Sequence, residues 1–317
     1  MVRIAVAGGS GQVAREVIDA LVATGKHEIT VLSRRDLQSA DATDPGVKQR
    51  TVNYGNVHNL TEALQGVHTL LSFVQILSDP NQESQKNLID AAIASGVRRF
   101  APSEYGSKGT NHMAWWAGKE AIREYLEEVN ATEKKLEYTL FQPGLFLDYL
   151  AFPYKTAKYL DPLQSVFDFE HRRAIVVDGH EDAILTLTTV SDLSEIIARA
   201  VEYEGAWPRH GGIRGNRLTF SDILRIGETV RGHFDVDKVY LEDLRAGNLK
   251  TSWGLEAVHH AVSDDQAAEL LRAVSIGILL SSVEGAWDSS DSMSRLFPDF
   301  KFTTAHDFLV RAWDGKP

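Results

Sequence analysis

The sequence contains no cysteine among its 317 residues. This absence excludes disulfide bonds, thiolate nucleophiles and zinc–thiolate sites. Histidine and carboxylate side chains remain as candidate metal ligands, but the eleven histidines contain no H-x-x-x-H or H-E-x-x-H spacing. The adjacent His259 and His260 cannot both face one metal ion from a regular helix or strand. We therefore expect no metal site and place these two histidines on the surface or at a helix cap.

Positive charge is also scarce. The chain has 33 Lys and Arg residues against 44 Asp and Glu, which gives a formal net charge of -11. Nucleic-acid surfaces need clustered Lys and Arg, so we expect no nucleic-acid partner. The sequence lacks any run of roughly eighteen apolar residues, and it enters a strand directly with no leader-like segment. We expect a cytoplasmic protein with no membrane partner, as a monomer or homodimer.

The N-terminal segment combines an apolar strand with a glycine-rich turn. Residues 3–7 are small or β-branched in the main, and the motif Gly9-x-Gly11-x-x-Ala14 follows them. It matches the dinucleotide fingerprint, in which backbone N–H groups at a helix N-terminus bind a pyrophosphate. The residues expected around this pyrophosphate are Gly8, Gly9, Ser10, Gly11, Gln12 and Val13. A glycine turn that binds no ligand is the alternative.

The second predicted strand, residues 28–33, ends at Arg34 and Arg35. In nucleotide-binding folds, an acidic residue about twenty positions after the glycines binds the ribose of NAD, whereas arginine accommodates the 2′-phosphate of NADP. We therefore predict NADP(H) as the cofactor, with Arg34 and Arg35 at its phosphate. Asp36 could compete with them, and two solvated surface arginines are the alternative.

Strand and helix patterns alternate along the first half of the chain. The further predicted elements are the strands 50–53, 69–74, 98–102 and 138–142 and the helices 60–64 and 84–94. This βαβ alternation indicates an α/β fold with a Rossmann-like, doubly wound parallel sheet. Ligands of such sheets bind outside the carboxyl ends of the strands. Phe73 and Ser103 are therefore expected beside the cofactor.

The remaining chain is less regular and predicts a smaller C-terminal lobe. Its expected elements are the strands 173–177, 185–190 and 239–241 and the helices 191–201, 220–230 and 267–280. Ser191 or Asp192, and Ser221, are the expected N-caps of the first two helices. We divide the chain into an NADP-binding domain at 1–150 and a substrate-binding lobe at 151–317, some of whose elements are expected to return to the first domain.

One lysine lies on the apolar side of a predicted helix. Residues 114–129 form a helical pattern, and its apolar stripe, continued backwards by three residues from Ile122, reaches Lys119. A lysine in that position either extends its ammonium to water or contacts an anionic group. Both interpretations stay open on periodicity alone.

Several motifs are distributed over nearly the whole chain. Besides the glycine motif they are S-G-V-R-R-F at 95–100, P-S-E-Y-G at 102–106, Q-P-G-L-F at 142–146, T-T-V-S-D at 188–192 and L-F-P-D at 296–299. Together they resemble the NmrA-like and isoflavone-reductase-like family of atypical short-chain dehydrogenases, especially its fungal members. In the plant reductases of this family, a lysine on the helix after the P-S-E-[FY]-G motif belongs to the active site. Lys119 matches it, so the resemblance implies a catalytic Lys119 beside the cofactor.

Tyr154 and Lys158 have the spacing of the active pair of classical short-chain dehydrogenases. They follow the predicted strand 138–142, whereas the helix that carries the classical pair precedes that strand. We therefore favour Lys119 over this pair and place Tyr154 in the substrate lobe.

Aromatic and apolar side chains near the end of strand 138–142 are the candidates for substrate contact. They are Tyr105, Met113, Phe146, Tyr149 and Tyr154. We predict an NADPH-dependent reductase of a carbonyl or conjugated double bond in a small aromatic or polyketide-like metabolite. Two alternatives stay open. One is a non-catalytic NADP(H) sensor that binds a protein partner, as the NmrA resemblance implies, and the other is a lyase or isomerase on the same fold.

Overall fold

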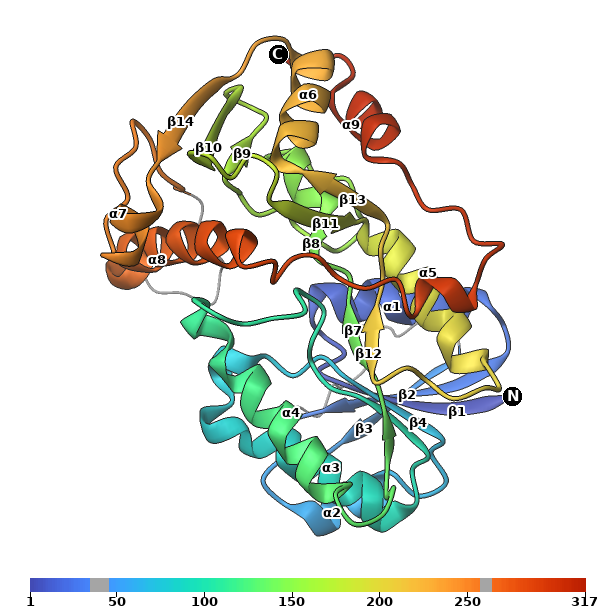
Figure 1. Ribbon diagram of the computed structural model, residues 1–317. Coiled ribbons are helices and arrows are strands. Elements are labelled where there is room, and N and C mark those ends of the chain that lie inside the picture. The colour runs from blue at the N-terminus through green and yellow to red at the C-terminus, as the bar shows by residue number, and fades with distance from the viewer. Residues whose placement is uncertain (35–45, 257–263) are drawn as a thin grey trace.

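A computed structural model describes residues 1–34, 46–256 and 264–317 (Figure 1). Its main sheet has six parallel strands in the order β3-β2-β1-β4-β5-β6. Their bounds are β1 (Val2–Ala7), β2 (His27–Ser33), β3 (Val47–Thr51), β4 (Thr69–Ser72), β5 (Arg99–Ala101) and β6 (Glu137–Tyr138). The chain runs outward from β1 to one edge and then from β4 to the other. This is the doubly wound Rossmann-like sheet that the alternation predicts.

Helices cover both faces of this sheet (Figure 1). One face carries α1 (Gln12–Ala23) and α5 (Val190–Glu202), and the other carries α2 (Val57–Ala63), α3 (Glu83–Ser95) and α4 (Ala117–Val129). The alternation of side chains along β1 explains this arrangement. Ile4 and Val6 pack into the core beneath α1 and α5, whereas Ala5 and Ala7 pack into the core beneath the other three helices.

The rest of the chain forms smaller sheets, in the orders β13-β11-β8, β14-β10-β9 and β12-β7. Their strands are β7 (Leu140–Gln142), β8 (Leu145–Phe146), β9 (Phe167–Asp168), β10 (Arg173–Val177), β11 (Ile184–Thr188), β12 (His210–Gly212), β13 (Asn216–Thr219) and β14 (Asp235–Val239). The later α-helices are α6 (Phe220–Arg231), α7 (Leu241–Arg245), α8 (Asp264–Val283) and α9 (Ala305–Trp313). The 3-10 helices are η1 (Ile76–Ser78), η2 (Pro80–Gln82), η3 (Ala114–Trp116), η4 (Leu147–Ala151) and η5 (Ser294–Leu296). Helix α5 returns to pack on α1. The domain division at residue 150 stays a prediction.

Several expected strands differ from those observed. The expected strand 138–142 is divided at Thr139, because β6 pairs with β5 whereas β7 leaves the main sheet and pairs with β12. Thr139 is bonded on both sides of this division. Its N–H donates to the carbonyl of Phe100 in β5, and its hydroxyl donates to the carbonyl of Pro208, just before β12. Strand β3 begins three residues before its expected start, because it is an exposed edge strand with no apolar alternation. Strand β14 ends at Val239, and the residues after it enter α7.

The N-caps of α5 and α6 are threonines that lie two or three positions before the residues expected. The hydroxyl of Thr189 accepts the N–H of Asp192 at 3.0 Å, and that of Thr219 accepts the N–H of Asp222 at 3.0 Å. Asp222 completes a capping box by accepting the N–H of Thr219. Helix α5 therefore begins at Val190, directly after the threonine.

Candidate active site

The glycine loop joins the carboxyl end of β1 to the N-terminus of α1. Gly8 has a φ of +73°, and a Cβ atom there would lie 2.7 Å from the carbonyl carbon of Phe73. A Cβ atom at Gly9 would lie 2.6 Å from Cγ1 of Val31. Gly11 donates its N–H to the carbonyl of Gly8 at 3.0 Å and is the N-cap of α1. Side chains are excluded at Gly8 and Gly9 because these two positions touch the residue after β4 and the Val31 side chain of β2.

The N-terminus of α1 is suited to an anion. Within the described residues, no side chain caps this helix and its first turn contains no acidic residue. The unpaired N–H groups of a helix N-terminus and the helix dipole both favour negative charge there. The loop therefore fits a pyrophosphate, and the amides of Gln12 and Val13 are the groups that would face it.

The side chain of Gln12 is already engaged with a later segment. Its Nε2 donates to Oδ2 of Asp161 at 2.5 Å, and its Oε1 accepts the N–H of Asp161 at 3.1 Å. One turn along α1, Glu16 accepts the N–H of Tyr159 at 2.5 Å. The segment 155–161 is thus held along one side of α1, beside the glycine loop.

Tyr154 and Lys158 have separate contacts. Nζ of Lys158 pairs with Asp19 of α1 at 2.6 Å, and this pair lies at the surface. The ring of Tyr154 meets Trp313 of α9 edge-on, with ring centroids 5.4 Å apart. The contacts of the two side chains explain their positions without a catalytic pairing.

Tyr54 fastens the glycine loop to β2, a role that the sequence did not reveal. Its hydroxyl accepts the N–H of Gly8 at 3.2 Å and donates to the carbonyl of Leu32 at 3.0 Å. Burial raises the pKa of Tyr54 to about 12, against the opposing effects of the Gly8 hydrogen bond and of the charge on Arg34. The exposed Arg34 follows β2 directly, so its charge lies near the loop. Arg35 and Asp36 lie outside the described residues, as do His259 and His260.

Lys119 is buried in α4, with 3% of its surface exposed. Its Nζ donates to the carbonyl oxygen of Glu104 at 2.5 Å and lies 3.4 Å from the centre of the Trp116 ring. The ammonium therefore neither reaches water nor touches a carboxylate, and a carbonyl and an indole replace both expected partners. Burial lowers the pKa of Lys119 to about 7, with the charge of Glu104 opposing this change and that of Arg123 adding to it.

A chain of contacts connects Lys119 to the glycine loop. The backbone of Phe73, which follows β4, lies against Gly8. The ring of Phe73 stacks on that of Tyr105, with centroids 4.4 Å apart and planes 3° apart. Tyr105 directly follows Glu104, the partner of Lys119. Gly8, Phe73 and Glu104 thus follow the carboxyl ends of β1, β4 and β5, where parallel sheets bind ligands, and Lys119 of α4 contacts the loop after β5.

Ser103 lies in the same region, next to Tyr105. Its N–H donates to Oε1 of Gln85 at 3.0 Å, and the hydroxyl of Ser72 donates to the same oxygen at 3.3 Å. Gln85 of α3 thus joins the ends of β4 and β5. The backbone of Ser103 is fixed by this contact, and Gln85 is a further residue of the site that the sequence did not reveal.

The candidate substrate residues fall into two groups. Tyr105, Phe146 and Tyr149 pack on the hydrophobic core that also holds Phe73 and Val13. Phe146 meets Tyr149 edge-on, with ring centroids 5.6 Å apart. Met113 and Tyr154 belong instead to the core of the C-terminal sheets. Three of the five candidates therefore share one core, and Tyr105 is connected to the glycine loop through its stack on Phe73.

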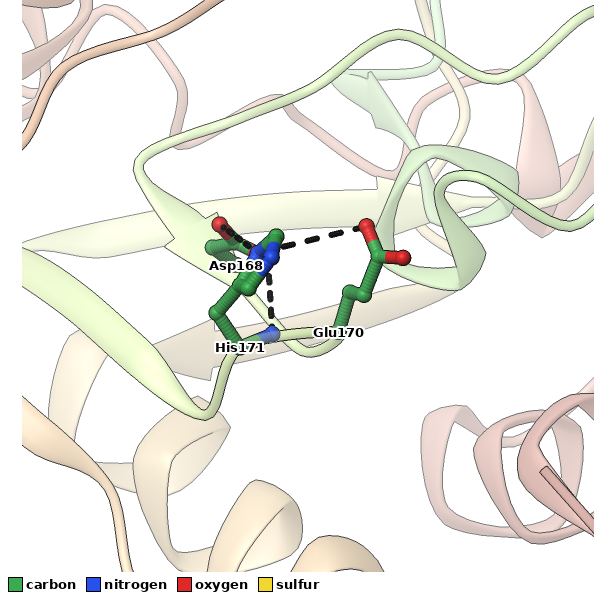
Figure 2. Close-up of side chains that lie close together, drawn as sticks. All are labelled: Asp168, Glu170 and His171. Atoms are coloured by element: carbon green, nitrogen blue, oxygen red, sulfur yellow. Dashed lines mark hydrogen bonds and ion pairs between the residues drawn. The ribbon is translucent and has the colours of Figure 1, made fainter. Parts of the chain in front are cut away.

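Asp168, Glu170 and His171 offer possible metal ligands within 4.8 Å of one another, the one such group among the described residues. Figure 2 shows all three around the turn after β9. Oδ2 of Asp168 already accepts from Nε of Arg173 at 2.8 Å and contacts Nδ1 of His171 at 2.9 Å. Burial raises the pKa of Asp168, but the hydrogen bonds from Arg173 and His171 outweigh it and lower the pKa. We interpret the group as an ion-pair cluster that closes the turn.

Comparisons with known proteins place the chain in a family. A model described as the NmrA-like family matches residues 2–245. Oxidoreductase swnN of Metarhizium robertsii is 29% identical over 342 residues, with 100% of this chain and 98% of the relative covered. Oxidoreductase BOA1 of Botryotinia fuckeliana is 33% identical over 236 residues, with 73% of this chain and 77% of the relative covered.

The fold also has solved counterparts. The NADPH-dependent quinone oxidoreductase QOR2 of Escherichia coli, solved in complex with NADPH, superimposes with a TM-score of 0.71 at 19% identity, over 98% of this chain and 99% of that one. No helix within residues 1–34, 46–256 and 264–317 is long and apolar enough to cross a membrane. The sequence motifs, the sheet order and the family match agree, and the chain belongs to the NmrA-like family.

Proposed function

We propose that this protein is an NADPH-dependent oxidoreductase that reduces a carbonyl or a conjugated double bond in a small aromatic or polyketide-like metabolite. The observation that carries the proposal is a buried lysine, with a pKa of about 7, at the same sheet edge as the glycine loop. The oxidoreductase names of the fungal relatives and the NADPH of the bacterial structural counterpart support it.

The cofactor fits the residues that the loop and β2 provide. The N–H groups at the start of α1 take the pyrophosphate, the backbones of Gly8 and Gly9 allow its close approach, and Arg34 takes the 2′-phosphate. Ser10 and Ser103 line the same edge. When bound, NADPH supplies the hydride that the substrate receives.

Lys119 is the proton donor of the reaction. Nζ of a lysine has three N–H donors, of which one is used by the carbonyl of Glu104. Because its pKa lies near neutrality, the ammonium can release a proton to a substrate oxygen, and the neutral amine can be protonated again after each turnover. Tyr105, Phe146 and Tyr149 supply apolar surface for an aromatic substrate.

The test is NADPH oxidation by the purified protein across a panel of quinones, aromatic ketones and conjugated enones. We expect stoichiometric loss of NADPH and formation of reduced product with at least one class. Isomerised or cleaved product without loss of NADPH would identify a lyase or isomerase instead.

A non-catalytic NADP(H) sensor is the second candidate. The observation that favours it is that the Lys119 ammonium is already held by the Glu104 carbonyl and the Trp116 ring. A sensor would bind NADP+ and NADPH with similar affinity and turn over no member of the panel.

A further inference from the structure

One helix holds Glu104 at two points. Lys119 and Arg123 lie one turn apart on α4, and both reach Glu104. Nζ of Lys119 donates to the backbone carbonyl at 2.5 Å. The Arg123 guanidinium binds both carboxylate oxygens, with Nε to Oε1 at 3.0 Å and Nη2 to Oε2 at 2.6 Å. The Glu104 side chain is 1% exposed and the Arg123 side chain 11%, so this bidentate pair is shielded from solvent.

We propose that Glu104 and Arg123 are positioning residues for Lys119, which fix the carbonyl that receives its hydrogen bond and balance the charge beside its ammonium. The inference rests on the proposed catalytic function of Lys119. The pair itself does not have to touch cofactor or substrate.

The loop after β5 shows why such a pair is needed. A Cβ atom at Gly106 would lie 2.7 Å from Cη2 of Trp116 and 3.0 Å from Nζ of Lys119, so the loop backbone is pressed against the ammonium. Arg123 also donates to the carbonyl of Lys108 at 3.1 Å. The guanidinium therefore holds both ends of the segment 104–108 against α4. A displaced loop would move the Glu104 carbonyl away from Lys119.

The charges around Lys119 act in opposite directions. The Glu104 carboxylate favours the ammonium, and the Arg123 guanidinium disfavours it. Glu120, on the same helix, accepts from Arg123 at 2.7 Å and offsets part of its charge. His210 of β12 feels the charges of both Glu104 and Arg123, and burial lowers its own pKa, which favours its neutral form. Removing the charge of one member of the pair therefore leaves the charge of the other member uncompensated, and the pKa of Lys119 should change accordingly.

The direct test follows the titration of Lys119 itself in the cofactor-bound protein. Lysine labelled with 13C and 15N gives NMR signals that report the Nζ charge, and Lys119→Met assigns the signal. We expect Glu104→Gln to move the titration midpoint down by about one pH unit and Arg123→Gln to move it up by a similar amount. The double variant should return close to the wild-type midpoint. Shifts in the same direction for both single variants, or none, would overturn the proposal.

One further variant separates charge from geometry, and a second is a distant control. Arg123→Lys keeps the positive charge but loses the bidentate contact, so its midpoint should stay near that of the wild type while kcat falls. A normal kcat in this variant would contradict the positioning role, and the variant also serves if Arg123→Gln does not fold. The control is Arg173→Gln, which removes a similar guanidinium from the buried Asp168 carboxylate. Strand β10 lies at the other end of the molecule from α4 (Figure 1), so this variant should leave the Lys119 midpoint unchanged.

The pH profile of kcat/KM separates this inference from the proposed function. If both hold, the profile shifts in the same order as the NMR midpoints. NMR midpoints that shift as expected with an unchanged pH profile would support the positioning pair and exclude Lys119 as the titrating group of the reaction.

Discussion

Tyr105 lies flat on Phe73, with ring planes 3° apart and centroids separated by 4.4 Å. The stack joins the loop after β5 to the end of β4. Tyr105 has a φ of +35°, a value that is uncommon for a residue with a side chain. Its hydroxyl is buried and has no hydrogen-bond partner within the described parts of the chain, and burial raises its pKa well above 10. The phenol is therefore protonated, and we expect its O–H, besides the apolar ring, to donate to a substrate oxygen when substrate binds.

Tyr105→Phe tests this role because it preserves the stack and removes only the hydroxyl. The free energy of unfolding should stay the same or rise by up to about 1 kcal/mol, because a buried unsatisfied group is lost. The kcat/KM for an oxygen-bearing substrate should fall by roughly tenfold, the effect of one lost hydrogen bond. Urea unfolding and steady-state kinetics provide both values. A clear loss of stability with normal kcat/KM would instead give the hydroxyl a role in the fold.

Substitutions of Gly8 and Gly9 should differ in whether a second substitution, at Val31, restores NADPH binding. Gly9→Ala places a Cβ against the Val31 side chain, whereas Gly8→Ala places one against the backbone of Phe73. Both should weaken NADPH binding. Both changes are then made in a Val31→Ala protein, and the Val31→Ala single variant is the matched control. The double variant with Gly9→Ala should bind NADPH almost as tightly as this control, whereas the one with Gly8→Ala should still bind NADPH weakly. Calorimetric Kd values decide the matter, and equal rescue of both glycines would contradict the geometry of the loop.

Arg34 should determine the preference for NADPH over NADH. Arg34→Ala is expected to weaken NADPH binding by about 1 to 3 kcal/mol, because a charge-assisted contact to the 2′-phosphate is lost. NADH binding should change little. Fluorescence titration with both cofactors measures the difference, and equal weakening of the two would remove Arg34 from the phosphate site.

The stability of the fold should depend on pH through Lys119. Its pKa is about 7 in the folded state, below the value of about 10.4 for an unfolded lysine. Between these two values the unfolded chain binds one more proton, so stability gained from this residue rises with pH. Relative to Lys119→Met, the free energy of unfolding should increase by about 1.4 kcal/mol per pH unit from pH 7 to 10. A flat difference would mean that the lysine is not held neutral in the folded protein.

Local patterns in the sequence were sufficient to predict the main sheet and the buried side of α4. The apolar run of β1, the glycine motif and the βαβ alternation predicted the doubly wound sheet. The helical stripe through Ile122 placed Lys119 on the buried side of α4, where it lies. These features depend on neighbours along the chain, and such signals are readable without a structure.

Features that depend on distant contacts were not predictable. The link from Tyr54 to Gly8 joins residues 46 positions apart, and the Glu104 carbonyl that binds Lys119 lies in a loop 15 positions before it, where no periodic pattern applies. Strand β7 leaves the main sheet because a partner strand some seventy residues later, β12, is available. Met113 and Tyr154 were grouped with Tyr105 by sequence proximity and aromatic character, yet the structure assigns them to another core.

The helix caps are a different case, since the sequence contains a local signal for them, which was misread at α5 and α6. Helices α5, α6 and α9 each follow a threonine, Thr189, Thr219 or Thr304, with an aspartate three residues later. The threonine hydroxyl accepts the N–H of that aspartate in each helix. The Thr-x-x-Asp spacing, which resembles a capping box, therefore marks the start of all three helices.

Lys119→Met, compared with Lys158→Met, tests the central claim most directly. Both variants replace a lysine with a methionine, which is similar in size and uncharged. Lys119 is buried beside Glu104, whereas Lys158 forms a surface pair with Asp19. With the best substrate of the carbonyl panel, we predict that Lys119→Met lowers the kcat of NADPH oxidation by roughly 100-fold or more. Lys158→Met should retain the wild-type kcat. A Lys119→Met protein that folds, binds NADPH and turns over normally would contradict the account.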